Sequence, residues 1–537
     1  MRNIIFFLFL VSITVIGCSD SRDSQDNASV QTPKRDTLRI NIGTEPPTLD
    51  WSKSTDSTSY TILINIMEGL TTFGKDYKPV PALAESWQIS KDGTIYTFKL
   101  REDVKWSDGR PLVAKDFEYS WKRLLNPDTG ADYAYFLYDI KNAEEYNTGK
   151  IKDPDSVGVK SLDDHTLQVI LKKPASFFLS IVSFMSTFPM REDIVQQHQI
   201  KWTEPENIVT LGAYKLSSWK HHEKLTLAKN EKYWGDKPKI NKVEMIMNEN
   251  QSSALALYES GELDYVDTKS MPHLEIPRLR MSPDFRTQPQ FTVSYLGFNV
   301  KKAPFDNPLV RKAFSAAINR QNISEVVQGG GIPTTSWIPK GMLAFNEDIG
   351  IDFDPERAKE FLKRAGFQSP ADFPKTTFLY PDVRNNRIIA ESLQSMWKEY
   401  LGVGVELINQ EWKVYLDTLD TDPPHIYRAG WAADFPDPHN FMNLFVCNSG
   451  NNETGWCNPV YDNLVDTAAG ELDENTRIEL YNQAQTLLTE TDVPIAPFLI
   501  SIQQSMLKPY IQGLEPNPLG FIFFNRVSFK NENTASN

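Results

Sequence analysis

The sequence predicts a mixed α/β protein built around more than one hydrophobic core. Segments with the alternation typical of strands and segments with helical spacing follow one another, but without a strict strand–helix–strand rhythm. The chain has 537 residues, and a single core normally stops growing beyond about 300 residues. We therefore expect two or three lobes.

The strand prediction depends on three alternating segments. Polar and apolar residues alternate over 38–42, 87–90 and 94–100, as in half-buried strands. The last two segments are separated by Lys91-Asp92-Gly93, which is typical of a hairpin turn. We therefore expect residues 94–100 to bury one face in a sheet.

The helix prediction depends on spacing and on helix starts. Apolar residues three and four apart predict a helix over 113–124. Two further helices are predicted over 307–327 and 354–365, because each begins with an N-cap residue followed by proline. Gly366 is the expected stop of the last helix.

Residues 1–17 resemble a targeting segment. Arg2 is followed by an apolar run over 4–16, and a small residue precedes Cys18, as in a lipoprotein signal peptide. A spanning helix needs about 20 apolar residues, so the alternative of a plain membrane anchor is less favoured. We expect cleavage before Cys18, lipid attachment there, and a location outside the cytoplasm, in the periplasm or on the outer face of the cell membrane.

The composition argues against nucleic acid or an anionic membrane surface as a partner. The net charge is −14, and removing residues 1–17 with their one cation, Arg2, gives −15. Binding to polyanions requires clustered cations. Residues 18–35 are polar and lack aromatic residues, so we expect a flexible tether, with lipid as the only attachment to the membrane.

Two further cysteines, Cys447 and Cys457, lie ten positions apart. In an oxidising compartment a disulfide between them is the preferred interpretation. Two free thiols and half of a metal site are the alternatives. No histidine lies close to either cysteine in the sequence, which weakens the metal interpretation.

Motifs of known catalytic chemistry are not found in the sequence. It contains no Gly-x-Ser-x-Gly, His-Glu-x-x-His, phosphate loop or Gly-x-Gly-x-x-Gly. Adjacent side chains on a strand point to opposite faces, so His221-His222 is interpreted as surface. The glycines at 329–331 fit a turn or hinge better than an anion site. We expect no enzyme activity, no cofactor and no bound metal.

Several long motifs occur in one order along the chain. They read PALAESW at 81–87, LREDVKWSDGRP at 100–111, NIVTLGAY at 207–214, NEKYW at 230–234 and APFDN at 303–307. Together they resemble the extracytoplasmic solute-binding proteins of ABC importers, family 5, over nearly the whole mature chain. The segments NQEWK and RAGWAAD, which end at Lys413 and Asp434, resemble its oligopeptide-binding branch.

The resemblance implies a large two-lobed periplasmic-binding-protein type II fold with an extra domain. One lobe would combine residues 36–67, 192–290 and 503–537. The extra domain would span 68–191, and the opposite lobe 291–502. Ligand would lie between the lobes and be enclosed when they close about a hinge.

The resemblance also implies that Asp434 holds the α-ammonium of a peptide. An extended peptide offers N–H and C=O groups that a strand edge can pair with, whatever its side chains. Its terminal charge then fixes the register, and a desolvated ammonium needs a carboxylate partner. The alternative is that Asp434 is a loop residue accepting backbone N–H bonds.

Other ligand contacts follow from the same resemblance. Tyr133 would contact the ligand backbone, and Trp412 and Trp431 would line side-chain pockets, with core packing as the alternative. Arg428 would orient Asp434 or pair with ligand carboxylates. Main-chain hydrogen bonds are expected from Ser57, Gly430 and Ala432.

The chain also departs from the branch it resembles. Gln328, Asn386 and Leu419 stand where the branch has cationic or imidazole groups for the peptide C-terminus, which leaves ligand length open. Thr292 and Ala432 stand where it has a cysteine pair.

These features predict a monomeric lipoprotein receptor that captures short peptides and delivers them to an ABC-importer permease and ATPase. Another solute (a cell-wall peptide, nickel or haem) is the first alternative. A peptide-sensing or chaperone lipoprotein is the second. An exported hydrolase is the least favoured, because no nucleophile–base pair or metal cluster is visible in the sequence.

Overall fold

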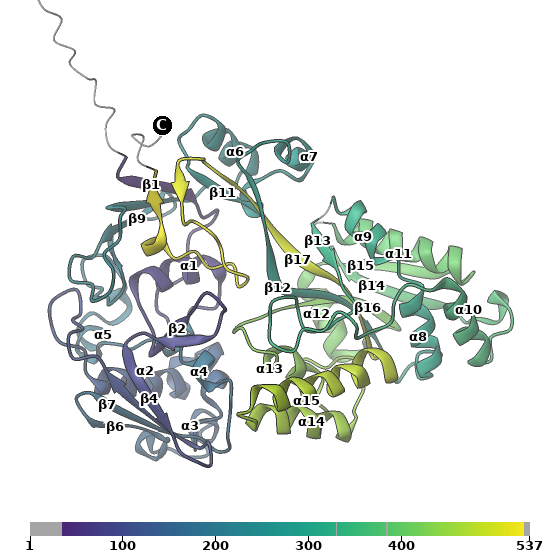
Figure 1. The fold of residues 1–537 in the computed structure, drawn as a ribbon, viewed down its shortest axis with the longest axis horizontal. Helices are drawn as coiled ribbons and strands as arrows, with labels where there is room; N and C mark the ends of the chain where they lie inside the picture. Colours follow the sequence, from purple (N-terminus) through teal and green to yellow (C-terminus); the bar gives the residue numbers. More distant parts are fainter. Residues whose placement is uncertain (1–34, 329, 383–384, 531–537) are drawn as a thin grey trace, which may run out of the picture. The chain divides into compact units, whose positions relative to one another are not determined.

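A computed structural model describes residues 35–328, 330–382 and 385–530. The expected signal peptide at 1–17, Cys18 and nearly all of the expected tether lie outside these residues. Strands and helices are mixed in the described part, as predicted (Figure 1). No helix in these ranges is both long enough and apolar enough to cross a membrane.

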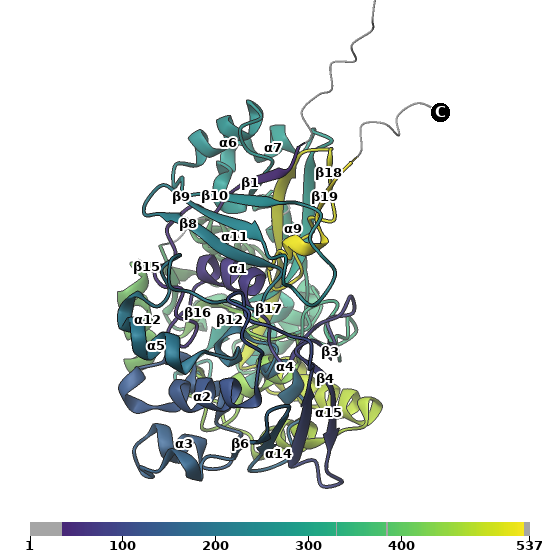
Figure 2. The same ribbon diagram turned by 90° about the vertical axis from the view of Figure 1, so that its left-hand side faces the viewer.

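The largest sheet in the described residues has eleven strands in the order β15-β14-β16-β12-β17-β11-β1-β10-β9-β8, with β13 paired to β17. Figure 2 shows the end formed by β10, β9 and β8. The eleven strands of this sheet are β1 Thr37–Asn41, β8 Tyr214–Lys220, β9 Lys224–Lys229, β10 Lys242–Ile246, β11 Tyr265–Asp267, β12 Phe285–Phe298, β13 Gly331–Pro333, β14 Thr376–Pro381, β15 Val405–Gln410, β16 Ile426–Ala432 and β17 Ile495–Leu507.

The long strands β12 and β17 join the two ends of this sheet. They pair antiparallel, and their register shifts between Pro289 and Val293. Strands β14 to β16 lie on one side of the pair, and β11, β1 and β10 lie on the other. The predicted lobe boundary at 290/291 falls within this register shift and the one at 502/503 lies next to it; the boundaries themselves stay predictions.

A separate four-stranded sheet, in the order β4-β5-β7-β6, lies wholly within the predicted extra domain. Its strands are β4 Ala84–Ile89, β5 Ile95–Leu100, β6 Val159–Asp163 and β7 Thr166–Ile170. The predicted hairpin is confirmed, because β4 and β5 pair antiparallel and Gly93 turns with φ +70°. Tyr96, Phe98 and Leu100 are buried, as predicted.

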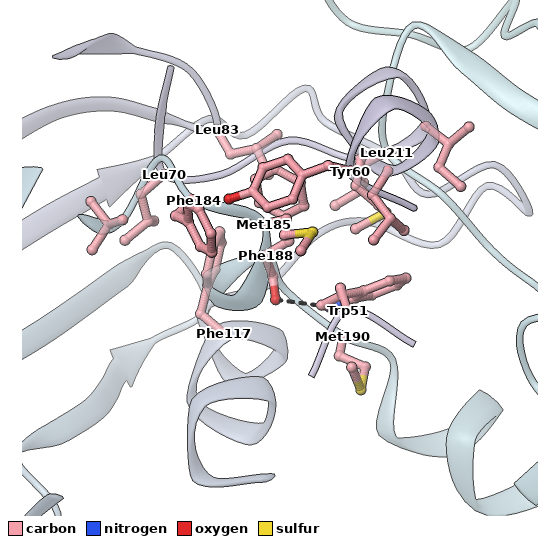
Figure 3. Close-up of a cluster of buried hydrophobic side chains, with 14 of the residues drawn as sticks. Trp51, Tyr60, Leu70, Leu83, Phe117, Phe184, Met185, Phe188, Met190 and Leu211 are labelled. Carbon is pink, nitrogen blue, oxygen red and sulfur yellow. Dashed lines mark hydrogen bonds between the residues drawn. The ribbon is translucent and has the colours of Figure 1, made fainter. Parts of the chain in front are cut away.

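The core beneath this sheet continues into the segment that precedes it. Figure 3 shows Trp51 and Tyr60 packed among Phe117, Phe184 and Phe188. The Trp51 indole N–H donates to the Phe188 carbonyl at 3.2 Å, so this buried polar group is satisfied. The predicted extra domain therefore shares one hydrophobic core with the first strands and helix of the chain.

Two of the three predicted helices are confirmed, as α2 Ala114–Leu125 and α10 Pro355–Arg364. The single helix predicted over 307–327 is wrong. The chain forms α8 Pro308–Ala316 and then α9 Arg320–Val326, because Asn319 leaves the helix and caps α9 through a bond from the Asn322 N–H at 3.0 Å.

The remaining elements complete the fold. The other α-helices are α1 Ser57–Ile66, α3 Ala143–Asn147, α4 Phe178–Ile181, α5 Glu192–His198, α6 Gln251–Glu259, α7 Ile276–Leu279, α11 Asn386–Tyr400, α12 Trp412–Thr421, α13 His439–Met442, α14 Pro459–Gly470 and α15 Glu474–Thr486. The short strands are β2 Thr71–Phe73, β3 Pro79–Pro81, β18 Ile511–Gln512 and β19 Ser528–Phe529.

Candidate functional site

Strand β16 is paired on both sides only at its beginning. Its neighbour β12 accompanies it to the pair Thr292–Ala432. On the other side, β14 pairs only with Ile426 and Tyr427. Within the described residues, β16 therefore has a strand on one side only from Arg428 onward.

The main chain of Gly430–Ala432 forms what we call the free edge. The His425 carbonyl and the Ala433 N–H both bond toward β12, at 3.0 and 2.8 Å. In an antiparallel ladder, successive residues direct their N–H and C=O groups to opposite sides. The groups of Gly430 and Ala432 therefore point away from β12, and both residues are exposed.

Asp434 lies just beyond the free edge. Its carboxylate is half-buried and accepts two long hydrogen bonds, from the Tyr133 hydroxyl at 3.4 Å and from the Asn440 amide at 3.3 Å. Among the described residues no cation forms an ion pair with it. Burial raises the pKa of Asp434, and the two hydrogen bonds oppose that rise. A carboxylate with spare acceptor positions and little water favours an ammonium partner.

Aromatic rings cluster around Tyr133, the residue whose hydroxyl donates to the Asp434 carboxylate. The Tyr133 ring lies 4.8 Å from Phe136 and 5.2 Å from Phe184, centroid to centroid. Tyr135 lies 5.9 Å from Tyr133 and is half exposed. Burial and the Asp434 charge both raise the pKa of Tyr133, so its hydroxyl keeps its proton and donates.

Arg428 carries a charge that has no ion pair within the described residues. Its guanidinium donates to the Ser294 hydroxyl at 3.2 Å, and its Nε is buried without a partner. Burial lowers the pKa of Arg428. No hydrogen bond or ion pair joins it to Asp434, so the contacts do not support the predicted role of orienting Asp434; the role of pairing with ligand carboxylates stays a prediction.

The two predicted tryptophans have different surroundings. Trp431 is half-buried, and its indole N–H donates to the Asn440 side-chain oxygen at 2.8 Å. Trp412 is 52 % exposed and stacks on Tyr415 with centroids 5.7 Å apart. Trp431 thus packs on the core beside the site, whereas Trp412 presents an open aromatic face.

The contacts of Ser57 differ from those of the other predicted site residues. It is the exposed first residue of α1, and its hydroxyl accepts a bond from the Lys269 ammonium at 2.7 Å. No hydrogen bond joins it to the free edge or to Asp434 in the described part of the chain. Its predicted role stays a prediction.

Asn440 is the residue that sequence reasoning missed. Its side-chain oxygen accepts from the Trp431 indole and from the Asp434 N–H at 3.2 Å, while its amide donates to the Asp434 carboxylate. It therefore orients both side chains. No motif points to it, because its position depends on the turn that leads into α13.

A disulfide joins Cys447 to Cys457, in the loop before α14. Loop closure of this size stabilises a fold by about 2–3 kcal/mol in the chain-entropy model. We expect a reductant to lower the melting temperature, measured by calorimetry. Because Cys457 is exposed, the reductant has access. The Cys447→Ser/Cys457→Ser variant should show the lower value with and without reductant; a shift that persists in this variant would contradict the assignment.

Comparisons with known proteins identify the family. The family described as "Bacterial extracellular solute-binding proteins, family 5 Middle" matches residues 78–453. This chain belongs to that family. Two relatives cover nearly its whole length. They are the oligopeptide-binding protein OppA of Bacillus subtilis, 35% identical over 98% of this chain and 99% of that protein, and the periplasmic oligopeptide-binding protein OppA of Salmonella typhimurium, 34% identical over 96% of each.

Solved structures confirm the fold expected for a family 5 solute-binding protein. The unliganded open form of the murein tripeptide binding protein MppA matches with a TM-score of 0.84 and 31% identity, over 93% of this chain and 98% of that one. Haemophilus influenzae OppA in complex with RPPGFSPFR matches with a TM-score of 0.72 and 31% identity, over 93% and 100%. The fold is the two-lobed type II periplasmic-binding-protein fold.

The donor groups at this site indicate which kind of ligand they suit. Across residues 35–328, 330–382 and 385–530, no three histidine, cysteine or acidic side chains are placed to hold an ion together. The donors near the free edge are main-chain groups, one carboxylate and one guanidinium. This set suits a ligand with an amine, a carboxylate and peptide groups.

Proposed function

We propose that this family 5 solute-binding protein captures short peptides outside the cytoplasm and delivers them to an ABC importer. One observation carries the proposal. The free edge at Gly430–Ala432 leads directly to Asp434, a half-buried carboxylate with no cation beside it in the described residues. Relatives named oligopeptide- and dipeptide-binding proteins support the same substrate class.

The peptide would add to β16 as an extra strand. Gly430 and Ala432 each offer one N–H and one C=O, which every peptide can pair with whatever its side chains. The α-ammonium would lie against Asp434, beside the Tyr133 hydroxyl. Trp412 and Trp431 would line side-chain pockets.

Arg428 would receive the ligand's carboxylate. It comes four residues before Ala432 in β16. Its guanidinium donates to Ser294, the β12 residue that pairs with Gly430, and has no ion pair of its own among the described residues. A peptide held at both ends would neutralise two uncompensated charges. This contact adds to the main-chain pairing rather than replacing it.

Lobe closure would complete the site. We propose that the lobes move about the register shift in β12 and β17, and that closure excludes water from the ion pair at Asp434. Attraction between charges strengthens as the surrounding dielectric falls. The closed receptor would then be the form that the permease recognises.

The cellular setting is also part of the proposal. We place the mature chain on the membrane through lipid at Cys18, with residues 18–35 as a tether, and as a monomer. A cell-wall peptide is the second candidate ligand, because the murein peptide-binding protein MppA of Escherichia coli is 33% identical over 94% of this chain. Nickel and haem are less favoured, since the described residues of the site offer one carboxylate and no histidine ligand set.

A pair of peptides tests the proposal. We expect trialanine to bind with measurable heat in calorimetry, and N-acetyl-trialanine to bind at least about a hundredfold more weakly, because the acetyl group removes the charge that Asp434 would pair with. Equal affinity for both would refute the anchoring role. Mass spectrometry after incubation should recover trialanine intact; cleavage would favour a hydrolase.

A further inference from the structure

The hydroxyl of Tyr415 bounds the free edge at its Arg428 end, which is the end away from Asp434. The Tyr415 hydroxyl donates to the Arg428 carbonyl at 2.7 Å, which is the next main-chain acceptor on the same side of β16. Tyr415 is 2% exposed, and Trp412 stacks on its ring. This hydroxyl therefore occupies its position in a fixed orientation.

Pro381 explains why the carbonyl is available to Tyr415. Strand β14 pairs with β16 in parallel, in the register Phe378–Ile426 and Leu379–Tyr427. Continued in this register, the ladder would bring the N–H of position 381 to the Arg428 carbonyl. Proline has no N–H, so the ladder stops there.

We propose that Tyr415 limits main-chain recognition to the first three residues of a peptide. This inference rests on the proposed function, because it assumes a peptide added to the free edge with its amine at Asp434. Asp434 lies two residues beyond Ala432, so such a peptide runs back toward Arg428, antiparallel to β16.

The register of that pairing gives the number of ligand residues that the free edge can bind through the main chain. In an antiparallel ladder every second residue exchanges a pair of hydrogen bonds with the residue opposite. The first ligand residue would lie opposite Ala432 and the third opposite Gly430. The fifth would need the Arg428 carbonyl, which already accepts from Tyr415. A longer peptide must leave the edge after its third residue.

The test is a length series of alanine peptide amides, with two to five residues, measured by calorimetry. The amide removes the terminal carboxylate and with it any pairing to Arg428. We expect the affinity to rise from two to three residues and then to stay within about twofold, because no further main-chain bond forms. A steady rise through five residues would overturn the proposal.

Tyr415→Leu tests the residue itself, since it removes the hydroxyl and the outer part of the ring. We expect pentaalanine amide to gain on the order of fivefold over trialanine amide in this variant, about the value of one hydrogen bond. Leu416→Val is the control: Leu416 is a 41% exposed side chain of α12 next to Tyr415, and shortening it leaves the Tyr415 bond in place. An unchanged ratio in Tyr415→Leu would overturn the proposal.

The outcomes separate this inference from the proposed function. If no unblocked alanine peptide binds the unmodified protein, the proposed function fails. If peptides bind and depend on Asp434, but affinity does not level off at three residues, only the role of Tyr415 fails. The series on the unmodified protein remains decisive even if Tyr415→Leu does not fold.

Discussion

Asp434→Asn is expected to weaken trialanine binding by about 2–5 kcal/mol, which is roughly thirtyfold or more in Kd. Asparagine has the same shape: its one side-chain oxygen can still accept from the Asn440 amide, and its own NH2 group can donate to the Tyr133 hydroxyl oxygen, so the fold should be unchanged. What is lost is the charge that would face the α-ammonium in a water-poor site. Calorimetry measures the loss, and circular dichroism checks the fold.

The matched control is Asp132→Asn, which removes an exposed carboxylate next to Tyr133. Its effect should be within about twofold, as for other solvated charges. Loss of binding in both variants would mean that general electrostatic attraction, and not one carboxylate, holds the ligand.

The same ion pair predicts how affinity depends on pH. Burial raises the pKa of Asp434, and the peptide's amine has a pKa near 8. Affinity should therefore fall as the pH drops through the raised pKa of Asp434, and fall again above about pH 8. Asp434→Asn should lose the acid limb and flatten the alkaline limb, since both arise from the same ion pair.

Asp437→Ala is expected to lower the free energy of unfolding by about 3–5 kcal/mol. Asp437 accepts two bonds from the Arg477 guanidinium, at 2.6 and 2.9 Å, and both side chains are less than a tenth exposed. Removing one partner leaves a buried charge uncompensated. Asp437 also accepts the His439 N–H at 2.8 Å at the start of α13, the helix that carries Asn440. Urea unfolding followed by tryptophan fluorescence measures the effect.

An exposed ion pair provides the comparison. Lys78 and Glu474 are 2.6 Å apart, but their side chains are 56% and 54% exposed. Glu474→Gln should change the free energy of unfolding by less than about 1 kcal/mol. Similar losses in Asp437→Ala and Glu474→Gln would contradict the importance given to burial.

Local patterns predicted local structure well. The hairpin of β4 and β5 follows from alternation and an Asp-Gly turn, and α10 follows from its cap and its stop. The break between α8 and α9 was not predictable, since apolar spacing continues through Ile323 and Val327 and only the capping by Asn319 interrupts it. The order of the large sheet was also out of reach, because strands such as β1 and β10 are about 200 residues apart.

Only part of the candidate site was predictable from the sequence. The resemblance pointed to Asp434, Tyr133 and the main chain of β16, and the structure brings Tyr133 into hydrogen-bond contact with Asp434. Asn440 and Tyr415 act through contacts that depend on how α12 and α13 pack, and no short motif records them. Arg428 donates to Ser294 rather than to Asp434, because the strand register decides which side chains of β12 lie beside it.

The short length of the free edge has a consequence for the empty receptor. Unpaired strand edges can pair with strands of other chains. Proteins prevent this aggregation by placing prolines, charged side chains or covering groups at such edges. Here Pro381 and Tyr415 block one end, and the negative charge of Asp434 marks the other. A stretch of three residues is too brief to template a neighbour's strand, so unloaded copies crowded on one surface should stay apart.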